Sequence, residues 1–140
     1  DDENAGFTDG MPWLAMNPNY RQINVREQEV RTDSVLAYYR RLVHLRKADA
    51  YRETFTYGIF EPAYQEMADV FAYYRVSGES GQRILVAANF GTDAVSLPLA
   101  YPCRQVLLSN LRAESAVETA CEKANALTLG SCEVAVIELG

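Results

Sequence analysis

The sequence predicts a mainly β protein, an antiparallel β-sandwich preceded by a long loop and one long helix. Two observations carry this prediction. From about residue 70 onward, short alternating or apolar segments are separated by turn residues, a spacing typical of sandwiches. Residues 35–45 instead repeat apolar side chains at helical spacing, and residues 4–24 follow no period at all.

The leading stretch, residues 4–24, is interrupted by Gly6, Gly10, Pro12 and Pro18, as expected for a loop. It nevertheless carries large apolar side chains, namely Phe7, Met11, Trp13, Leu14, Met16, Tyr20 and Ile23. Long loops in compact domains are usually functional, and a loop this apolar must lie on a surface. Because a chain of 140 residues offers few such surfaces, we expect it to be the end of a larger protein.

Two helices are expected after this loop. Asn24 and Glu27 have the spacing of a capping box, which predicts a short helix from Val25 to Val30. Thr32 or Asp33 is then expected to cap a longer helix over residues 34–47.

The apolar residues of this longer helix cover an arc of roughly 180°, wider than a helix resting on one partner needs. Arg46 falls near the centre of that arc. An unpaired cation in an apolar environment is costly, so we expect a buried carboxylate or carbonyl partner for Arg46. The helix is therefore predicted to lie between two layers.

Seven strands are predicted beyond residue 51. Arg52–Phe60 is interpreted as an irregular strand bent at Gly58. Val70–Val76 alternates and, across a Ser- and Gly-rich turn, is predicted to form a hairpin with Arg83–Phe90. Residues 84–88 are apolar on both faces, as expected for a central strand. Pro98 places its strand at a sheet edge. The remaining strands are predicted at 95–99, 105–111, 126–129 and 133–139.

Composition narrows the function classes. The net charge is −6, which disfavours nucleic acid and anionic membranes as partners. The apolar runs are too short to span a bilayer. Cys103, Cys121 and Cys132 contain no Cys-x-x-Cys pair, so we expect free buried thiols, no metal site and, mildly, a cytoplasmic location. No cofactor is expected either.

Several motifs in the first 47 residues resemble the late segment of α-glucosidases in glycoside hydrolase family 13. They are Asn4-Ala5-Gly6-Phe7-Thr8, Pro12-Trp13-Leu14, Asn17-Pro18-Asn19-Tyr20, Ile23-Asn24-Val25 and Gln28, then Asp33-Ser34-Val35, Tyr38-Tyr39-Arg40 and Leu42-Val43-His44-Leu45-Arg46-Lys47. The oligo-1,6-glucosidase branch, with its trehalose-6-phosphate hydrolase and dextran glucosidase relatives, is the most similar. One departure is Ser131-Cys132, where the family commonly has Pro-Tyr before its last strand.

The resemblance implies two domains. Residues 1–50 would be the C-terminal remnant of a (β/α)₈ catalytic barrel, ending in its last helix, and residues 51–140 would be the family's C-terminal β-sandwich. The partner of this chain would then be the N-terminal catalytic domain of the same polypeptide, whose substrate would be a short oligosaccharide. The implied function is that of a fragment of a retaining α-glucosidase that packs against the barrel and stabilises it.

No catalytic residue is expected in this chain. A retaining glycosidase needs two carboxyl groups about 5–5.5 Å apart, and the family motifs that carry them would precede Asp1. The one functional candidate is the leading loop, because loops after barrel strands form the active-site face. The resemblance implies that Asn4, Phe7 and Thr8 line or brace a sugar pocket and that Trp13 stacks on a sugar, although both aromatics could simply pin the loop to the barrel.

Two further readings remain open. The chain could be a non-catalytic carbohydrate-binding module, with Tyr73, Tyr74 and Tyr101 as a stacking platform, or a structural domain that caps the barrel. His44 is the only histidine and lies opposite the apolar arc of its helix, so a solvated surface position is expected for it. Linkage and substrate specificity are not encoded in this stretch.

Overall fold

A computed structural model describes residues 2–112 and 125–140. The chain divides into two compact units, Asp1–Arg41 and Leu42–Gly140. Within the described residues, no helix combines the length and the apolar character needed to cross a membrane.

The first unit contains a 3₁₀ turn, η1 (Glu3–Gly6), the short helix α1 (Val25–Glu29) and the beginning of α2 (Val35–Lys47). Asn24 caps α1 as predicted, since its side-chain oxygen accepts a hydrogen bond from the Glu27 N–H at 3.0 Å. The predicted cap of α2 is wrong by one or two residues: Ser34 Oγ accepts the Ala37 N–H at 3.1 Å. Ser34 is the only fully buried residue among the described residues of this unit.

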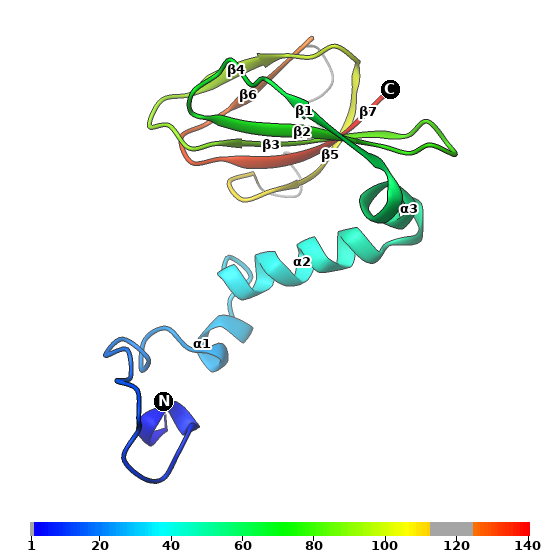
Figure 1. Cartoon of the computed structure of the whole chain (residues 1–140). Coiled ribbons are helices and arrows are strands. Elements are labelled where there is room, and N and C mark those ends of the chain that lie inside the picture. Colours follow the sequence, from blue (N-terminus) through cyan, green and yellow to red (C-terminus); the bar gives the residue numbers. More distant parts are fainter. Residues whose placement is uncertain (1, 113–124) are drawn as a thin grey trace. The chain divides into compact units, whose positions relative to one another are not determined.

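The second unit is a two-layer antiparallel sandwich, which confirms the predicted fold class. One sheet has the strand order β1-β2-β3-β7-β5, and the other pairs β4 with β6. The strands are β1 (Ile59–Ala63), β2 (Val70–Val76), β3 (Arg83–Asn89), β4 (Val95–Pro98), β5 (Cys103–Ser109), β6 (Ala126–Leu129) and β7 (Val134–Leu139). Figure 1 shows the two layers. Pro98 lies in the two-stranded sheet, where every strand is an edge, as its missing N–H predicts.

The hydrophobic core lies between the two sheets. Its buried members come from both layers and are Ala72, Leu85, Ala87, Leu97, Val106, Leu127, Leu129, Ala135, Ile137 and Leu139. None of the described residues of the first unit belongs to this cluster. The central strand β3 is buried or half-buried at every position, so both of its faces are largely shielded from solvent, as its apolar residues require. The helix α3 packs on the neighbouring strand β2.

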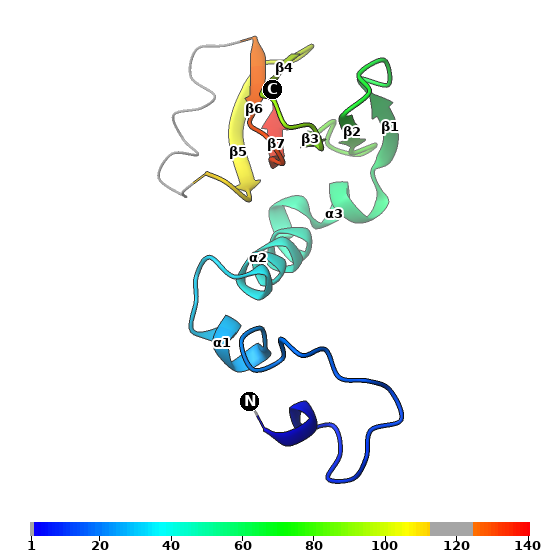
Figure 2. The ribbon, with the colours of Figure 1, turned by 90° about the vertical axis from the view of Figure 1, so that its left-hand side faces the viewer.

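The predicted irregular strand over Arg52–Phe60 is wrong. Residues Asp49–Tyr57 form the helix α3, and the first strand begins only at Ile59. Tyr51, Thr54 and Phe55 are spaced i, i+3 and i+4, so they share one helical face, and Thr54 and Phe55 are buried. Figures 1 and 2 show α3 on the side of the five-stranded sheet away from β4 and β6. The aromatic and threonine content suggested a strand, but burial of this face against the sheet decides for a helix.

The expectation of free buried cysteines is also wrong in part. Cys132 is a free thiol, but it is exposed. Cys103 is disulfide-bonded, and Cys121 lies outside the described residues. Because persistent disulfides are typical of oxidising compartments, the thiol argument for the cytoplasm no longer holds, and that location stays only a prediction.

Candidate functional site

The side chains of Asn4 and Thr8 brace the first part of the leading loop. Asn4 Nδ2 donates to the Thr8 carbonyl at 3.0 Å and to the Gly10 carbonyl at 3.1 Å, and Thr8 Oγ1 accepts the Gly10 N–H at 3.1 Å. Asn4 and Ala5 have positive φ angles of 52° and 54°, followed by Gly6 at 75°. Asn tolerates this left-handed region better than most residues, so its conformation and its bonds both explain why it begins the turn.

The two aromatic candidates, Phe7 and Trp13, are not covered by the rest of the loop. Phe7 is 83% exposed and Trp13 is 91% exposed, and Met11 between them is 96% exposed. Asn4 and Thr8 therefore brace the loop, while Phe7 and Trp13 project from it. Whether they line a sugar pocket or pin the loop to a barrel depends on a neighbour, and both readings stay predictions.

A groove of about 590 Å³ lies within the first unit. Its lining is mostly apolar and includes Ala5, Phe7, Met16, Tyr20 and Ile23. Among the residues that the structure describes, Arg26 is the one charged residue in the lining, and no carboxylate lines the groove. Such a groove can accept a flat apolar surface, but it has no group for acid–base chemistry on a glycosidic bond.

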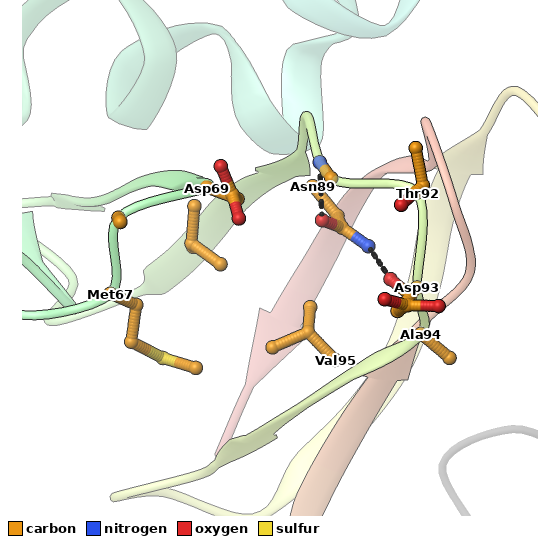
Figure 3. Close-up of a pocket in the computed structure, with 10 residues that line it drawn as sticks. Met67, Asp69, Asn89, Thr92, Asp93, Ala94 and Val95 are labelled. Carbon is orange, nitrogen blue, oxygen red and sulfur yellow. Dashed lines mark hydrogen bonds between the residues drawn. The ribbon is translucent and has the colours of Figure 1, made fainter.

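A smaller hollow of about 300 Å³ lies in the second unit, beside the end of β3 (Figure 3). Asn89 lines it, and both polar ends of its side-chain amide are hydrogen-bonded: Nδ2 donates to the Asp93 and Gly130 carbonyls at 2.8 Å each, and Oδ1 accepts the Gly91 N–H at 2.9 Å. Asp69 and Asp93 also line the hollow, and both are exposed. Ligand sites bury most of their ligand and orient it with convergent polar groups, which this hollow of exposed carboxylates does not do.

The buried carboxylates of the sandwich already have structural partners. Glu133 accepts hydrogen bonds from Arg112 Nε at 2.6 Å, Ser109 Oγ at 2.9 Å and the Gly130 N–H at 2.8 Å. Burial by itself raises the pKa of Glu133, but the bonds from Arg112, Gly130 and Ser109 outweigh it and leave that pKa below its ordinary value. Glu133 is therefore an ionised anchor between the end of β5 and the β6–β7 turn.

Glu138 holds α3 on the outer face of the five-stranded sheet. Its two oxygens accept Gln82 Nε2 at 3.0 Å and Gln105 Nε2 at 2.8 Å, and Gln105 also donates to the Tyr51 hydroxyl of α3 at 2.9 Å. Neither this network nor the Glu133 anchor was predicted from the sequence. A lone acidic residue inside an apolar strand, such as Glu138 between Ile137 and Leu139, is the signal that points to a paired buried charge.

Arg46 is exposed in this chain, and the described residues hold no hydrogen bond or ion pair for it. The prediction that it is buried and paired is thus not met within these residues, because the apolar arc around it is itself uncovered: α2 has no buried residue, and Val35 and Tyr39 are exposed. The prediction now concerns a neighbour outside the chain. His44 is exposed, as expected.

Comparisons with known proteins indicate the same family as the motifs of the leading loop. Residues 1–58 match the family model of the alpha-amylase catalytic domain. The chain is 36% identical over 116 residues to a glucan 1,6-alpha-glucosidase of Streptococcus pneumoniae, covering 83% of this chain and 21% of that protein. It is 40% identical over 94 residues to an oligo-1,6-glucosidase of Bacillus cereus, covering 66% of this chain and 16% of the relative.

The fold comparison agrees. The crystal structure of an isomaltulose synthase from Klebsiella superposes with a TM-score of 0.84 at 32% sequence identity, covering all of this chain and 24% of that one. These similarities define a class, the glycosidases of the alpha-amylase superfamily. Within it, the chain is a segment related to family 13 α-glucosidases, and it spans about a fifth of the length of the first relatives.

Proposed function

We propose that this chain is the C-terminal part of a retaining α-glucosidase that hydrolyses α-glucosidic bonds in short oligosaccharides. In this proposal the chain is itself non-catalytic: its first 50 residues complete a (β/α)₈ barrel, and its sandwich packs against that barrel and stabilises it. The relatives that act on such bonds are several times longer than this chain, which supports a catalytic domain preceding it.

The observation that carries the proposal is the uncovered apolar surface of the first unit. Met11, Trp13 and Phe7 are largely exposed in the leading loop, and Val35 and Tyr39 are exposed on α2. Several large apolar side chains exposed in one small unit favour contact with another protein surface. Since burial stabilises by about 25 cal/mol per Å² of apolar area, this surface favours association with a missing body.

The absence of catalytic machinery is supported by the carboxylates that the structure describes. Glu133 and Glu138 are buried, and their oxygens are occupied by protein donors. Asp69 and Asp93 line an open hollow without enclosing it. Neither arrangement provides an acid and a nucleophile on opposite sides of an enclosed sugar.

The test compares two proteins on an aryl α-glucoside. The first is the 140-residue chain, and the second is the polypeptide encoded when the reading frame is extended upstream of Asp1. We expect turnover with retention of the anomeric configuration, followed by NMR, from the longer polypeptide only. Turnover by the 140-residue chain, lost on replacing Asp69 or Asp93 by Asn, would overturn the proposal.

A carbohydrate-binding role is separated by a second measurement. Isomaltose or starch is titrated against the 140-residue chain, with Tyr101→Ser as a variant of the predicted stacking platform. Saturable binding that this variant removes would support a binding module. The proposal expects no such binding.

A further inference from the structure

Asp9 is the only aspartate in the sequence that a glycine follows, and both residues are exposed in the leading loop. Among the described residues, no hydrogen bond or ion pair holds the Asp9 carboxyl group, so this group can turn toward the peptide nitrogen of Gly10. Gly10 itself has no Cβ to obstruct that approach. A Cβ built there would meet only Thr8 Oγ1 within 4 Å among the described residues, at 3.8 Å.

The hydrogen bonds of Asn4 and Thr8 hold the backbone on both sides of Asp9. Asn4 Nδ2 bridges the Thr8 and Gly10 carbonyls at 3.0 and 3.1 Å, and Thr8 Oγ1 accepts the Gly10 N–H at 3.1 Å. We call these three bonds the Asn4 brace. Thr8 and Gly10 are exposed, so water competes for each bond and the net gain from it is small. Segments held in this way open far more often than the core strands of a sheet.

We propose that Asp9-Gly10 is a site of spontaneous backbone rearrangement and that the Asn4 brace limits its rate. When the brace opens, the Gly10 nitrogen attacks Asp9 Cγ: an N–Cγ bond forms, a Cγ–O bond breaks, and the hydroxyl leaves with the amide proton as water. The two groups belong to adjacent residues, so the attack has the high effective concentration of an intramolecular reaction. The product is a cyclic succinimide.

Water then opens the ring at one of its two carbonyl carbons. Opening at Cγ restores Asp9, whereas opening at the main-chain carbonyl carbon leaves the chain running through Cβ and Cγ, which is isoaspartate. The water released in the first step is replaced in the second, so the reaction needs no oxidant, reductant or other co-reactant.

Isoaspartate would release the loop from its brace. It inserts an extra carbon into the backbone between Thr8 and Gly10, so the single Nδ2 of Asn4 no longer reaches both carbonyls. The modification therefore converts a braced turn into an unbraced one. All of the atoms involved lie in residues 4–10, so this inference does not depend on the proposed function.

The experiment follows isoaspartate in the 140-residue chain during incubation at neutral pH and physiological temperature. Peptide mapping with electron-transfer fragmentation distinguishes isoaspartate from aspartate at equal mass, and it detects the succinimide as the loss of one water. Asp33-Ser34 is the internal control, because a small residue also follows this aspartate. There the carboxylate accepts Arg31 Nε at 3.0 Å and Nη2 at 2.9 Å, and Ser34 is buried.

Three variants test the site and its brace. Gly10→Ala places a Cβ beside the attacking nitrogen. Asn4→Asp removes the bridging donor but keeps a residue type that tolerates the positive φ. Asn19→Asp is its matched control, because it adds the same charge to the leading loop outside the brace.

We expect isoaspartate to accumulate at Asp9 and not at Asp33. Gly10→Ala should slow its formation by about fivefold or more. Asn4→Asp should speed it by about threefold or more, since two of the three bonds of the brace are lost, and Asn19→Asp should leave the rate unchanged. Equal accumulation at Asp9 and Asp33, or a rate that Gly10→Ala does not lower, would overturn the site. If Asn4→Asp and Asn19→Asp have the same rate, the role of the brace is refuted.

Discussion

Replacing Glu133 by Gln should lower the free energy of unfolding of the sandwich by about 2–3 kcal/mol. The Glu133 side chain is 5% exposed and that of Arg112 is 20% exposed, so the pair is largely shielded from water. Breaking a buried pair by removing one partner costs about 3–5 kcal/mol. Gln keeps one oxygen to accept bonds, and Arg112 can be partly hydrated, so the expected loss lies below that range.

The pH dependence of this effect follows from the sign of the pKa shift. The folded-state pKa of Glu133 is lowered, so its contribution is fully present above the ordinary value of about 4.3 and is lost as the pH falls through the folded-state pKa. The difference between wild type and Glu133→Gln should therefore be largest near neutral pH. It should shrink on acidification, because the wild type then loses the charge that the variant lacks.

Urea denaturation of the 140-residue chain, followed by circular dichroism at neutral pH and in a series of acidic buffers, measures both effects. A lower midpoint with an unchanged slope would show lost stability of the native state. Glu79→Gln is the control, since Glu79 is exposed on the turn between β2 and β3. If Glu133→Gln and Glu79→Gln shift the midpoint equally, or if the Glu133→Gln effect grows in acid, the anchoring role assigned to Glu133 is wrong.

Three further predictions concern other parts of the chain. Gly58→Ala should lower the free energy of unfolding by about 2–3 kcal/mol, because an added Cβ would lie 2.4 and 2.9 Å from two backbone carbonyl oxygens. Gly78→Ala is the control: a Cβ there meets nothing within 4 Å, so the loss should be less than about 1 kcal/mol. Similar losses for the two variants in thermal unfolding would contradict the predicted clash at Gly58. Cys132→Gly should stabilise the chain by about 0.5–1 kcal/mol, because Cys132 has a φ of 54° that favours glycine. Ser131→Gly is the control, since it relieves no positive φ. A lower melting temperature in both variants would refute backbone strain at Cys132. Trp13→Ser should change the stability of the 140-residue chain by less than about 0.5 kcal/mol. In the extended polypeptide the same substitution should lower kcat/KM by about tenfold or more. Unchanged kinetics of the extended polypeptide would show that Trp13 neither stacks on the substrate nor supports the loop.

Local sequence patterns were sufficient where the structure depends on neighbours along the chain. The Asn24 cap and the hairpin of β2 and β3 were predicted because capping, alternation and turn residues act within a few positions. The two-sided apolar character of β3 likewise predicted its interior place in the sheet. The motifs of the leading loop also contained enough information to indicate the family, and the comparisons support it.

Other features depend on contacts between residues that are far apart in the sequence. Asp49–Tyr57 is helical because one of its faces is buried on the sheet, a fact that its aromatic and threonine residues could not reveal. The partners of Glu133 and Glu138 lie in or next to other strands, 21 to 56 residues away apart from the nearby Gly130. For the same reason the exposure of Arg46 follows only from the folded chain. The sequence by itself determined the sandwich and its kinship, because both follow from local pattern and motif; the tertiary structure decided which charges are anchored and which apolar faces remain open, because burial is a property of distant segments brought together.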